Sequence, residues 1–448
     1  MPGTKMPDNR YEKAVSYLYS LQKFGIKLGL ANITHISGLL AAPQTAYKTI
    51  HVAGTNGKGS TCAMLQGILM EKGYKTGIFT SPHMVRFTER IKVNGEEISP
   101  DDVVALTEEI NQAINGVDGL NPTFFEFVTA IAFLYFRKRG VDWVVFETGM
   151  GGRFDATNII MPEASVITNV NIDHREFLGN TIEEIAVEKA GIIKRDTPVI
   201  TTSQTPGALG VIRQKAGELN ARLEVFGEDF DAQPIRQDIT GTTFKYRGGS
   251  EFEALTIPFT GTHQVENAAC AVRTAEVLFS NSTEGIELAL RDIKWPGRCE
   301  LVKHAGMDVL LDGAHNPAAA EALASTLRGL YLKQPFSEVI LIFGAMADKD
   351  TAGMLRALMS AANTIILSAP SYERAERPQA LLAMAKVLPI SSTPALRTAP
   401  SIREAIKMAG KFYKQGGLVV ITGSFYTVGE AKEAMGQRPL LKELAEFK

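Results

Sequence analysis

Short apolar segments alternate along this chain with longer stretches in which hydrophobic residues recur every three or four positions. The short segments are typical of buried strands, and the periodic stretches are typical of helices that pack on a sheet. The expected strands are residues 50–53, 74–80, 143–147, 165–170, 309–311, 338–343, 364–368 and 418–421. The expected helices include residues 10–24, 101–115 and 123–136. This alternation predicts an α/β fold with mostly parallel sheets.

Trp295, Pro296 and Gly297 interrupt the alternation, because proline and glycine break regular structure. A chain of 448 residues is also too long for one ordinary core. We therefore predict two domains, residues 1–296 and 297–448. The first should be a mostly parallel sheet with a phosphate-binding loop (P-loop), and the second a smaller, Rossmann-like α/β domain. Residues 196–257 are more polar, and their pattern defines no strand clearly.

A glycine-rich loop with a lone lysine, residues 54–59, follows the first expected strand and precedes a helix that could start at Ser60. Glycines let backbone N–H groups approach phosphate oxygens, and the helix N-terminus and the lysine add positive charge. The match to G-x-x-x-x-G-K-[ST] is imperfect, because Val52 replaces the first glycine and Gly59 directly follows Lys58. A tight turn that merely needs glycine is the alternative. The polar residues around the lysine favour phosphate binding.

Ser81, Glu147 and His174 each follow an expected strand, at what should be one edge of the sheet. Ligands bind at the carboxyl ends of parallel strands in open α/β folds. A strand-end acid is the arrangement that holds Mg²⁺ on a bound nucleotide, and a hydroxyl can reach the same ion. The alternatives are an acid that caps a loop and a histidine with a structural role. We predict that the three side chains converge on magnesium.

The composition narrows the class of protein. Lysine plus arginine number 47 and aspartate plus glutamate 49, so no charge excess indicates nucleic acid as a partner. The three cysteines show no metal-binding spacing, which is typical of a reducing compartment. The first ten residues lack an apolar segment, and no apolar run is long enough to span a membrane. We expect a cytoplasmic, monomeric enzyme without a membrane partner.

Residues 54–58, Gly-Thr-Asn-Gly-Lys, resemble the ATP loop of the Mur ligases. The following Gly59-Ser60 makes the chain similar to the folylpolyglutamate synthase and dihydrofolate synthase branch of that superfamily. Further motifs of the branch occur in order: T-S-P-H from 80, T-x-F-E from 123, E-x-G-x-G-G-R-x-D-A-T-N from 147, D-H-x-x-x-L-G-x-T from 173, E-K-A-G from 188, H-Q-x-x-N-A from 263, L-D-G-A-H-N-P from 311 and F-G-x-x-x-D-K-D from 343.

The resemblance implies ATP-dependent ligation of L-glutamate to a folate or dihydropteroate through an acyl phosphate. It implies ATP and Mg²⁺ as cofactors, with two magnesium ions and a possible monovalent cation. The implied roles are catalysis for Lys58, His174 and Lys189; nucleotide binding for Gly54, Thr55, Asn56, Gly57, Lys58, Gly59, Ser60, Asn267, Arg298 and Asp312; substrate binding for Gly29, Leu30, Thr123, Phe124, Phe125, Glu126, Phe154, Asp155, Ala156 and His315; and magnesium binding for Ser81, Glu147 and His174.

Two of these residues have contrasting interpretations. Lys189 lies on a helix that Thr181 and Glu184 should open as a capping box. The resemblance implies that CO₂ carbamylates Lys189, whereas a lysine within a helix is more often a surface cation. The aromatic residues of 123–136 are typical of a core helix, which does not explain Glu126.

Two other functions compete with folate ligation. A Mur ligase of cell-wall precursors would usually carry a UDP-binding N-terminal domain, and only about 50 residues precede the loop here. A nucleotide-dependent switch would leave the motifs around Asp155 and His315 without a role. The sequence does not decide between dihydrofolate synthase and folylpolyglutamate synthase activity, nor which folate form and chain length are preferred.

Overall fold

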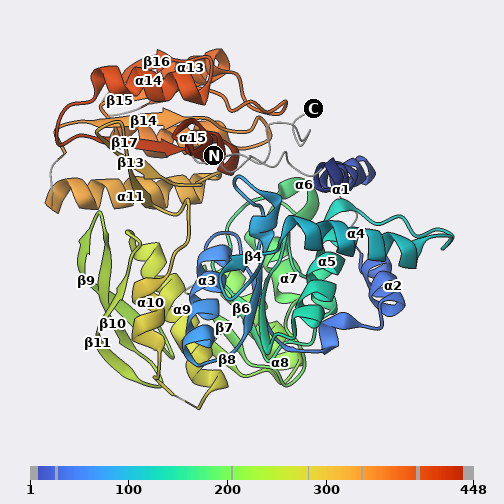
Figure 1. Cartoon of the computed structure of the whole chain (residues 1–448). Helices are drawn as coiled ribbons and strands as arrows, with labels where there is room; N and C mark the ends of the chain where they lie inside the picture. Colours follow the sequence, from blue (N-terminus) through green and yellow to red (C-terminus); the bar gives the residue numbers. More distant parts are fainter. Residues whose placement is uncertain are drawn as a thin grey trace, which may run out of the picture.

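The computed structural model describes residues 9–25, 29–202, 205–280, 282–333, 336–389 and 394–436. Within these ranges the chain forms three sheets (Figure 1). An eight-stranded sheet with its helices, and a three-stranded sheet beside it, make up what we call the first unit. A six-stranded sheet with its helices makes up the second unit, which lies across the top of the first in Figure 1.

The eight-stranded sheet places the predicted strands side by side in parallel, with β1 inside the sheet. β1 pairs with β5 and β6, and β2 pairs with β5, all in parallel. The order is β4 (Glu96–Glu97), β3 (Ile91–Val93), β2 (Thr76–Phe79), β5 (Trp143–Glu147), β1 (Lys48–Ala53), β6 (Ala164–Ile167), β7 (Val199–Thr201) and β8 (Leu223–Val225). The carboxyl ends of β1, β2, β5 and β6 therefore meet at one edge of the sheet.

Helices cover both faces of this sheet because its strands are apolar on both sides. One face packs on α3 (Lys58–Glu71), α9 (Thr262–Leu278) and α10 (Ile286–Asp292). The other face packs on α1 (Asn9–Ser20), α2 (Ala31–Leu39), α4 (Pro100–Ile114) and α5 (Phe124–Arg139), and farther along on α7 (Ile182–Ala190) and α8 (Pro206–Glu218). Helix α6 (Arg175–Leu178) is a single turn after β6.

The weakly patterned segment 196–257 contains regular structure that the sequence did not define. Besides β7 and β8, it forms the antiparallel strands β9 (Asp231–Asp238), β10 (Gly241–Arg247) and β11 (Glu251–Ile257). One buried carboxylate attaches this sheet to α9: Glu276 pairs with Arg273 at 3.0 Å and accepts a hydrogen bond from the Tyr246 hydroxyl at 2.7 Å. Strand β9 was not predicted, because many of its residues are exposed and its sequence is therefore not apolar.

The second unit is a doubly covered, mostly parallel sheet. Its order is β12 (Glu300–His304), β13 (Met307–Leu311), β17 (Leu418–Thr422), β14 (Val339–Phe343), β15 (Thr364–Leu367) and β16 (Ala395–Thr398). One face packs on α11 (Pro317–Lys333), α12 (Thr351–Leu358) and α13 (Pro378–Val387), and the other on α14 (Ile402–Phe412) and α15 (Phe425–Ala434). The edge strands β12 and β16 were not predicted, because neither is a continuous apolar run.

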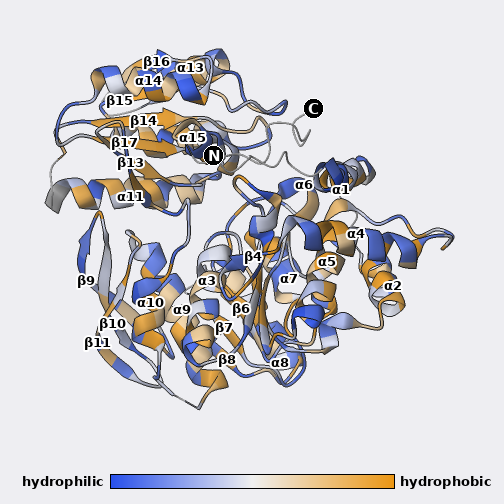
Figure 2. Cartoon of the chain, viewed as in Figure 1, coloured by the Kyte–Doolittle hydropathy of each residue, from blue (hydrophilic) through white to orange (hydrophobic). Residues whose placement is uncertain are grey.

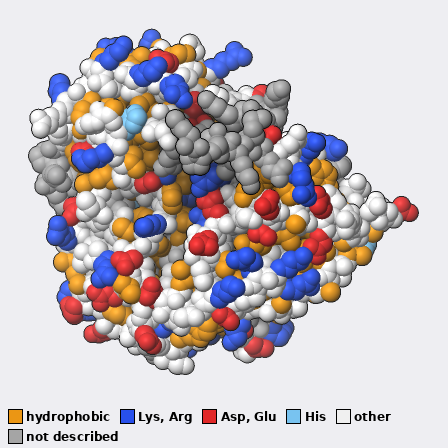
Figure 3. All heavy atoms as spheres, in the orientation of Figure 1, with side chains coloured by type: hydrophobic (Ala, Val, Ile, Leu, Met, Phe, Trp, Pro, Cys, Tyr) orange, Lys and Arg blue, Asp and Glu red, His pale blue; other side chains and the backbone are white. Residues whose placement is uncertain are grey.

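The predicted fold class, a P-loop domain with a mostly parallel sheet followed by a Rossmann-like unit, is confirmed. Figure 2 shows hydrophobic residues concentrated in the strands of both larger sheets and mixed colours on the covering helices. On the face drawn in Figure 3, positive and negative side chains are intermixed, in keeping with the small net charge. In the described part of the chain, no helix is both long enough and apolar enough to cross a membrane.

Candidate active site

The loop between β1 and α3 requires glycine at two positions. Gly54 and Gly57 have φ angles of 149° and 87°, which favour glycine. A Cβ on Gly54 would lie 1.7 Å from the Thr168 hydroxyl, and one on Gly57 would lie 2.3 Å from Asn267 Oδ1. Helix α3 begins at Lys58, two residues before the expected start, so its N-terminal N–H groups lie within the glycine loop.

Two lysines donate to one backbone carbonyl in this loop. Lys58 Nζ lies 3.1 Å and Lys189 Nζ lies 2.7 Å from the Gly54 oxygen. Lys189 is not the surface cation that its helical position suggested, because only 3% of it is exposed. Burial, together with the charge of Lys58, lowers the pKa of Lys189 to about 7. A large fraction of this amine is therefore uncharged near neutral pH.

The predicted magnesium ligands lie around the same pocket. Glu147 ends β5, and its Oε2 accepts a hydrogen bond from the Ser81 backbone N–H at 3.1 Å. Lys58 Nζ lies 4.0 Å from Glu147 Oε1. Ser81, Glu147 and His174 line one pocket together with residues 54–59, Lys189, Arg298 and His315. The described residues contain no cluster of three or more His, Cys, Asp or Glu side chains that could hold a metal.

Asp173 joins the two units beside this pocket. Its carboxylate lies 3.3 Å from Lys349 Nζ and accepts a hydrogen bond at 3.2 Å from Asn316, both in the second unit. Burial opposes ionisation of Asp173, but the neighbouring His174, Lys349 and His315 outweigh it and hold its pKa below the usual range. Burial lowers the pKa of both His174 and His315 to about 4.

Asp173, Asn316 and Lys349 each lie within a motif of the sequence, but no role was predicted for them. Their positions could have indicated a role, because each residue follows a strand and lies within a polar motif. What the sequence could not provide was the packing that brings the loops after β6, β13 and β14 together.

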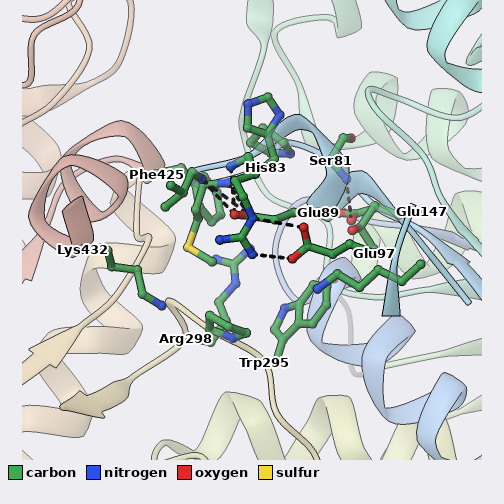
Figure 4. A pocket seen from close by; sticks show the side chains of 17 residues that line it. Ser81, His83, Glu89, Glu97, Glu147, Trp295, Arg298, Phe425 and Lys432 are labelled. Atoms are coloured by element: carbon green, nitrogen blue, oxygen red, sulfur yellow. Dashed lines mark hydrogen bonds and ion pairs between the residues drawn. The ribbon is translucent and has the colours of Figure 1, made fainter. Parts of the chain in front are cut away.

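A second pocket adjoins the first and lies between the two units. Figure 4 shows Ser81 and Glu147 on one side of it, Phe425 and Lys432 on the other, and Arg298 and Trp295 between them. The guanidinium of Arg298 lies over the Phe425 ring, 4.4 Å from its centre. Of the other residues expected to bind the nucleotide, Ser60, Asn267 and Asp312 border neither pocket.

Asn267 and Asp312 have structural contacts in this structure. Asn267 lies directly behind Gly57 and donates a hydrogen bond to the Gln264 side chain at 3.1 Å. Asp312 accepts backbone N–H bonds from Cys299 and Ala314, each at 2.9 Å. Both side chains therefore shape the loops that border the pocket, and direct contact with a nucleotide stays a prediction for them.

Glu126 has a structural role that its sequence pattern indicates but that was not predicted. T-x-x-E at 123–126 is a capping box: Thr123 N–H donates to Glu126 Oε2 at 2.7 Å, and Glu126 N–H donates to Thr123 Oγ1 at 3.3 Å. Asn32 of α2 donates to the same carboxylate at 3.2 Å. The cap fixes the start of α5, where Phe124 stacks on Tyr19 with ring centres 5.3 Å apart.

The other expected substrate residues are spread around the loops of the first unit. A Cβ on Gly149 would lie 2.5 Å from the Phe125 ring, so Phe125 packs under the pocket loop. Asp155 accepts N–H bonds from Met150 and Thr157 at 2.9 and 3.0 Å and so closes its own loop. None of Gly29, Leu30, Phe154, Asp155 and Ala156 lines the two pockets. Residues 26–28, next to Gly29, lie outside the described ranges.

Comparison with known proteins identifies the family. The Mur ligase middle domain matches residues 52–275, and the Mur ligase glutamate ligase domain matches residues 297–425. A dihydrofolate synthase/folylpolyglutamate synthase of Bacillus subtilis is 36% identical over 442 residues, which is 95% of this chain and 99% of the relative. The chain belongs to the folylpolyglutamate synthase/dihydrofolate synthase family. The resemblance read from the motifs is thereby confirmed, and so is the expected class of enzyme, an acid–amino-acid ligase.

Solved structures of family members support this assignment over almost the whole chain. A Mycobacterium tuberculosis folylpolyglutamate synthase complexed with ADP is 32% identical, with a TM-score of 0.87 and coverage of 96% of this chain and 100% of that one. An Escherichia coli FolC in complex with DHPP and ADP is 31% identical, with a TM-score of 0.84 and coverage of 96% and 98%. The family membership favours folate ligation over the two competing functions.

Glutamine in place of Glu126 tests its role as a cap. Because glutamine also completes a capping box, Glu126→Gln should change the free energy of unfolding by less than about 0.5 kcal/mol. Glu126→Ala should lower it by about 1–3 kcal/mol, since Thr123 N–H and Asn32 lose their acceptor. Chemical denaturation measures both values. Equal losses of unfolding free energy in the two variants would contradict the cap. A raised KM for the acceptor in Glu126→Gln, without a loss of stability, would indicate direct substrate contact.

Proposed function

We propose that this protein joins L-glutamate to a folate and to dihydropteroate, using ATP to form an acyl phosphate. The observation that carries the proposal is the meeting of Lys58, Lys189, Glu147 and His174 with His315 at one edge of the sheet. The first four come from the first unit and His315 from the second. The names of the relatives support both activities: the Bacillus subtilis and Escherichia coli proteins are each called dihydrofolate synthase/folylpolyglutamate synthase.

The proposed reaction has two steps. An oxygen of the acceptor carboxylate attacks the γ-phosphorus of ATP, which gives an acyl phosphate and ADP. The amine of glutamate then attacks the acyl carbon. The bond between that carbon and the bridging oxygen breaks, phosphate leaves with the oxygen and the bonding electrons, and the nitrogen loses a proton to give the amide. Position and electrostatic stabilisation supply most of the catalysis in phosphoryl transfer, so no serine or cysteine nucleophile is needed.

The loop residues 54–59 and Lys58 are proposed to hold the β- and γ-phosphates. The N–H groups at the start of α3 point into the loop, and Lys58 Nζ is held between the carbonyl oxygens of Gly54 and Thr55 at 3.1 and 3.2 Å. These donors can move from carbonyl oxygens to phosphate oxygens without refolding the loop. Residues Asn267, Arg298 and Asp312 are proposed to form the side of the cleft that binds the nucleoside.

The donor set fits a divalent cation. The Glu147 carboxylate is 4% exposed, and burial raises its pKa although the nearby Lys58 lowers it. A buried carboxylate is costly, and a cation beside it would relieve part of that cost. We propose Ser81, Glu147 and His174 as magnesium ligands. Magnesium would neutralise charge on the phosphates, and a second ion and a monovalent cation are further proposals of the same kind.

The second unit is proposed to supply the amine-binding side of the cleft. His315 Nδ1 lies 2.9 Å from the Gly313 carbonyl, so Nδ1 carries the proton and Nε2 is free to accept one. Nε2 lies on the pocket side, 4.0 Å from Asp173. An unprotonated Nε2 can accept an N–H of the incoming glutamate. The proposed domain division, 1–296 and 297–448, places this histidine and the P-loop on opposite sides of the cleft.

The cellular setting remains a proposal as well. We expect a cytoplasmic protein, and the finding that Cys62, Cys270 and Cys299 are all free and buried supports a reducing compartment. The monomeric state expected from the sequence stays a prediction.

Glutamate-dependent release of ADP tests the proposed function. The protein should release ADP with dihydropteroate or tetrahydrofolate as acceptor, and should not do so with a UDP-sugar peptide. Lys58→Ala should lower this rate on the order of 100- to 1000-fold, because charge on the transferred phosphoryl group loses its closest cation. Lys215→Ala, an exposed lysine paired with Glu218, is the control and should keep the rate. Near wild-type turnover in Lys58→Ala would contradict ATP binding by this loop.

Carbamylation of Lys189 is a separate prediction. The neutral amine reacts with CO₂ to give a carbamate and a proton, so the reaction exchanges a buried cation for an anion that can hold a metal. Because the pKa of Lys189 is lowered to about 7, the reactive fraction rises as pH increases through 7. With ¹³C-bicarbonate, a carbamate NMR signal should therefore grow over that range and be absent in Lys189→Ala. The variant should lose activity and regain part of it with formate or acetate; full activity without rescue would mean that Lys189 acts as an ordinary lysine.

A further inference from the structure

The loop that follows β2, residues 81–86, is fixed to the first unit along its length. The Glu89 carboxylate accepts hydrogen bonds from three successive N–H groups, those of Met84, Val85 and Arg86, at 2.8, 3.2 and 2.9 Å. The loop begins at Ser81, whose N–H is bonded to Glu147 in the pocket that residues 54–59 line. A shift of this loop would therefore disturb the proposed metal-binding side of the pocket.

The same loop contacts residues near the start of α5. Arg90 Nε donates to His83 Nδ1 at 2.8 Å, and the Arg90 guanidinium lies 5.3 Å from the centre of the Phe124 ring. Phe124 is one of the residues proposed to bind the acceptor. The 81–86 loop thus connects that residue with Glu147. Figure 4 shows His83 and Glu89 of this region together with Phe425 of the second unit.

Met84 extends from this loop into the second unit. It packs against the apolar cluster that contains Val428 and Ala431 of α15. Two glycines make room for it: a Cβ on Gly297 would lie 2.4 Å from Met84 Sδ, and a Cβ on Gly429 would lie 2.3 Å from the Met84 carbonyl oxygen. We call the recess formed by Gly297, Val428 and Gly429 the Met84 socket.

Hydrogen bonds and ring contacts connect the socket with the part of the second unit that lines the same pocket as Lys58. Gly297 N–H donates to Glu300 Oε2 at 2.7 Å, and Lys432 of α15 lies 2.6 Å from the same oxygen. Helix α15 begins with Phe425, which contacts Arg298 and lies 5.4 Å from the His315 ring, centre to centre. The depth at which Met84 sits in the socket therefore sets where Arg298 and His315 stand relative to Lys58.

We propose that Met84 is a positioning residue for the second step of the reaction, in which the amine of glutamate attacks the acyl phosphate. This inference rests on the proposed function, because it assigns the Met84 socket to that reaction. Reacting atoms must approach to about 3–3.5 Å, and a displacement of about 1 Å can cost on the order of 100-fold in rate. If the second unit is displaced, ATP is still cleaved on the first unit, but water reaches the acyl phosphate before the amine does.

Alanine at position 429 tests the inference with little harm to the helix itself. Gly429 lies within α15, where alanine is the better helix former, but its Cβ would meet the Met84 backbone. The matched control is Gly329→Ala in α11, since a Cβ there meets nothing within 4 Å. Gly429→Ala should lower kcat for ligation by about 10- to 100-fold and raise the KM for glutamate. It should also release more than one ADP per amide formed, whereas Gly329→Ala should match wild type in all three measures.

Substitutions of Met84 provide a second test if Gly429→Ala does not fold. Met84→Ala empties the socket and should also raise the ratio of ADP to amide, and Met84→Leu, of similar volume, should restore it. The inference would be overturned if Gly429→Ala and Met84→Ala both released one ADP per amide formed and both had the kcat of Gly329→Ala. Absence of glutamate-dependent ADP release from the wild-type protein would instead overturn the proposed function, so the two failures are distinguishable.

Discussion

The carbonyl oxygen of Gly54 is the point on which the site depends. Gly54 directly follows β1, and its carbonyl oxygen accepts hydrogen bonds from both Lys58 and Lys189. Two ammonium groups on one oxygen repel each other, and burial of Lys189 makes its charge still more costly. Burial and the charge of Lys58 lower the pKa of Lys189, which lessens this repulsion, and an anion such as a phosphate would lessen it further.

A second constraint is that this site is completed by another part of the chain. The first unit supplies the loop, the acid Glu147 and the buried lysine, and the second unit supplies Arg298, His315 and Lys349. The contacts of Asp173 with Lys349 and Asn316, and those of Met84 with Gly297 and Gly429, hold the units in register. An acyl phosphate is sensitive to water, so a cleft closed by such contacts suits its formation and use.

The parts predicted well from the sequence were those that local pattern determines. Buried strands such as β5 and β14 are continuous apolar runs, and the helix caps at Thr181 follow short-range rules. The burial of Lys189 could not be read from its helix, since a polar residue shows its surroundings only after α7 packs against the loop. Glu126 was the opposite case, because its capping pattern was local and was overlooked in favour of a substrate role. Contacts between the units, such as that of Asp173 with Lys349, carry no local signature.

The central claim is that this pocket transfers a phosphoryl group to a carboxylate before the amide forms. Dihydropteroate labelled with ¹⁸O in both carboxylate oxygens tests it directly, by mass analysis of the phosphate released during ligation with unlabelled ATP and glutamate. The account predicts one ¹⁸O atom in each phosphate for every amide formed, because the oxygen that bridges carbon and phosphorus leaves with the phosphate. Phosphate free of ¹⁸O, released in step with amide formation, would contradict it.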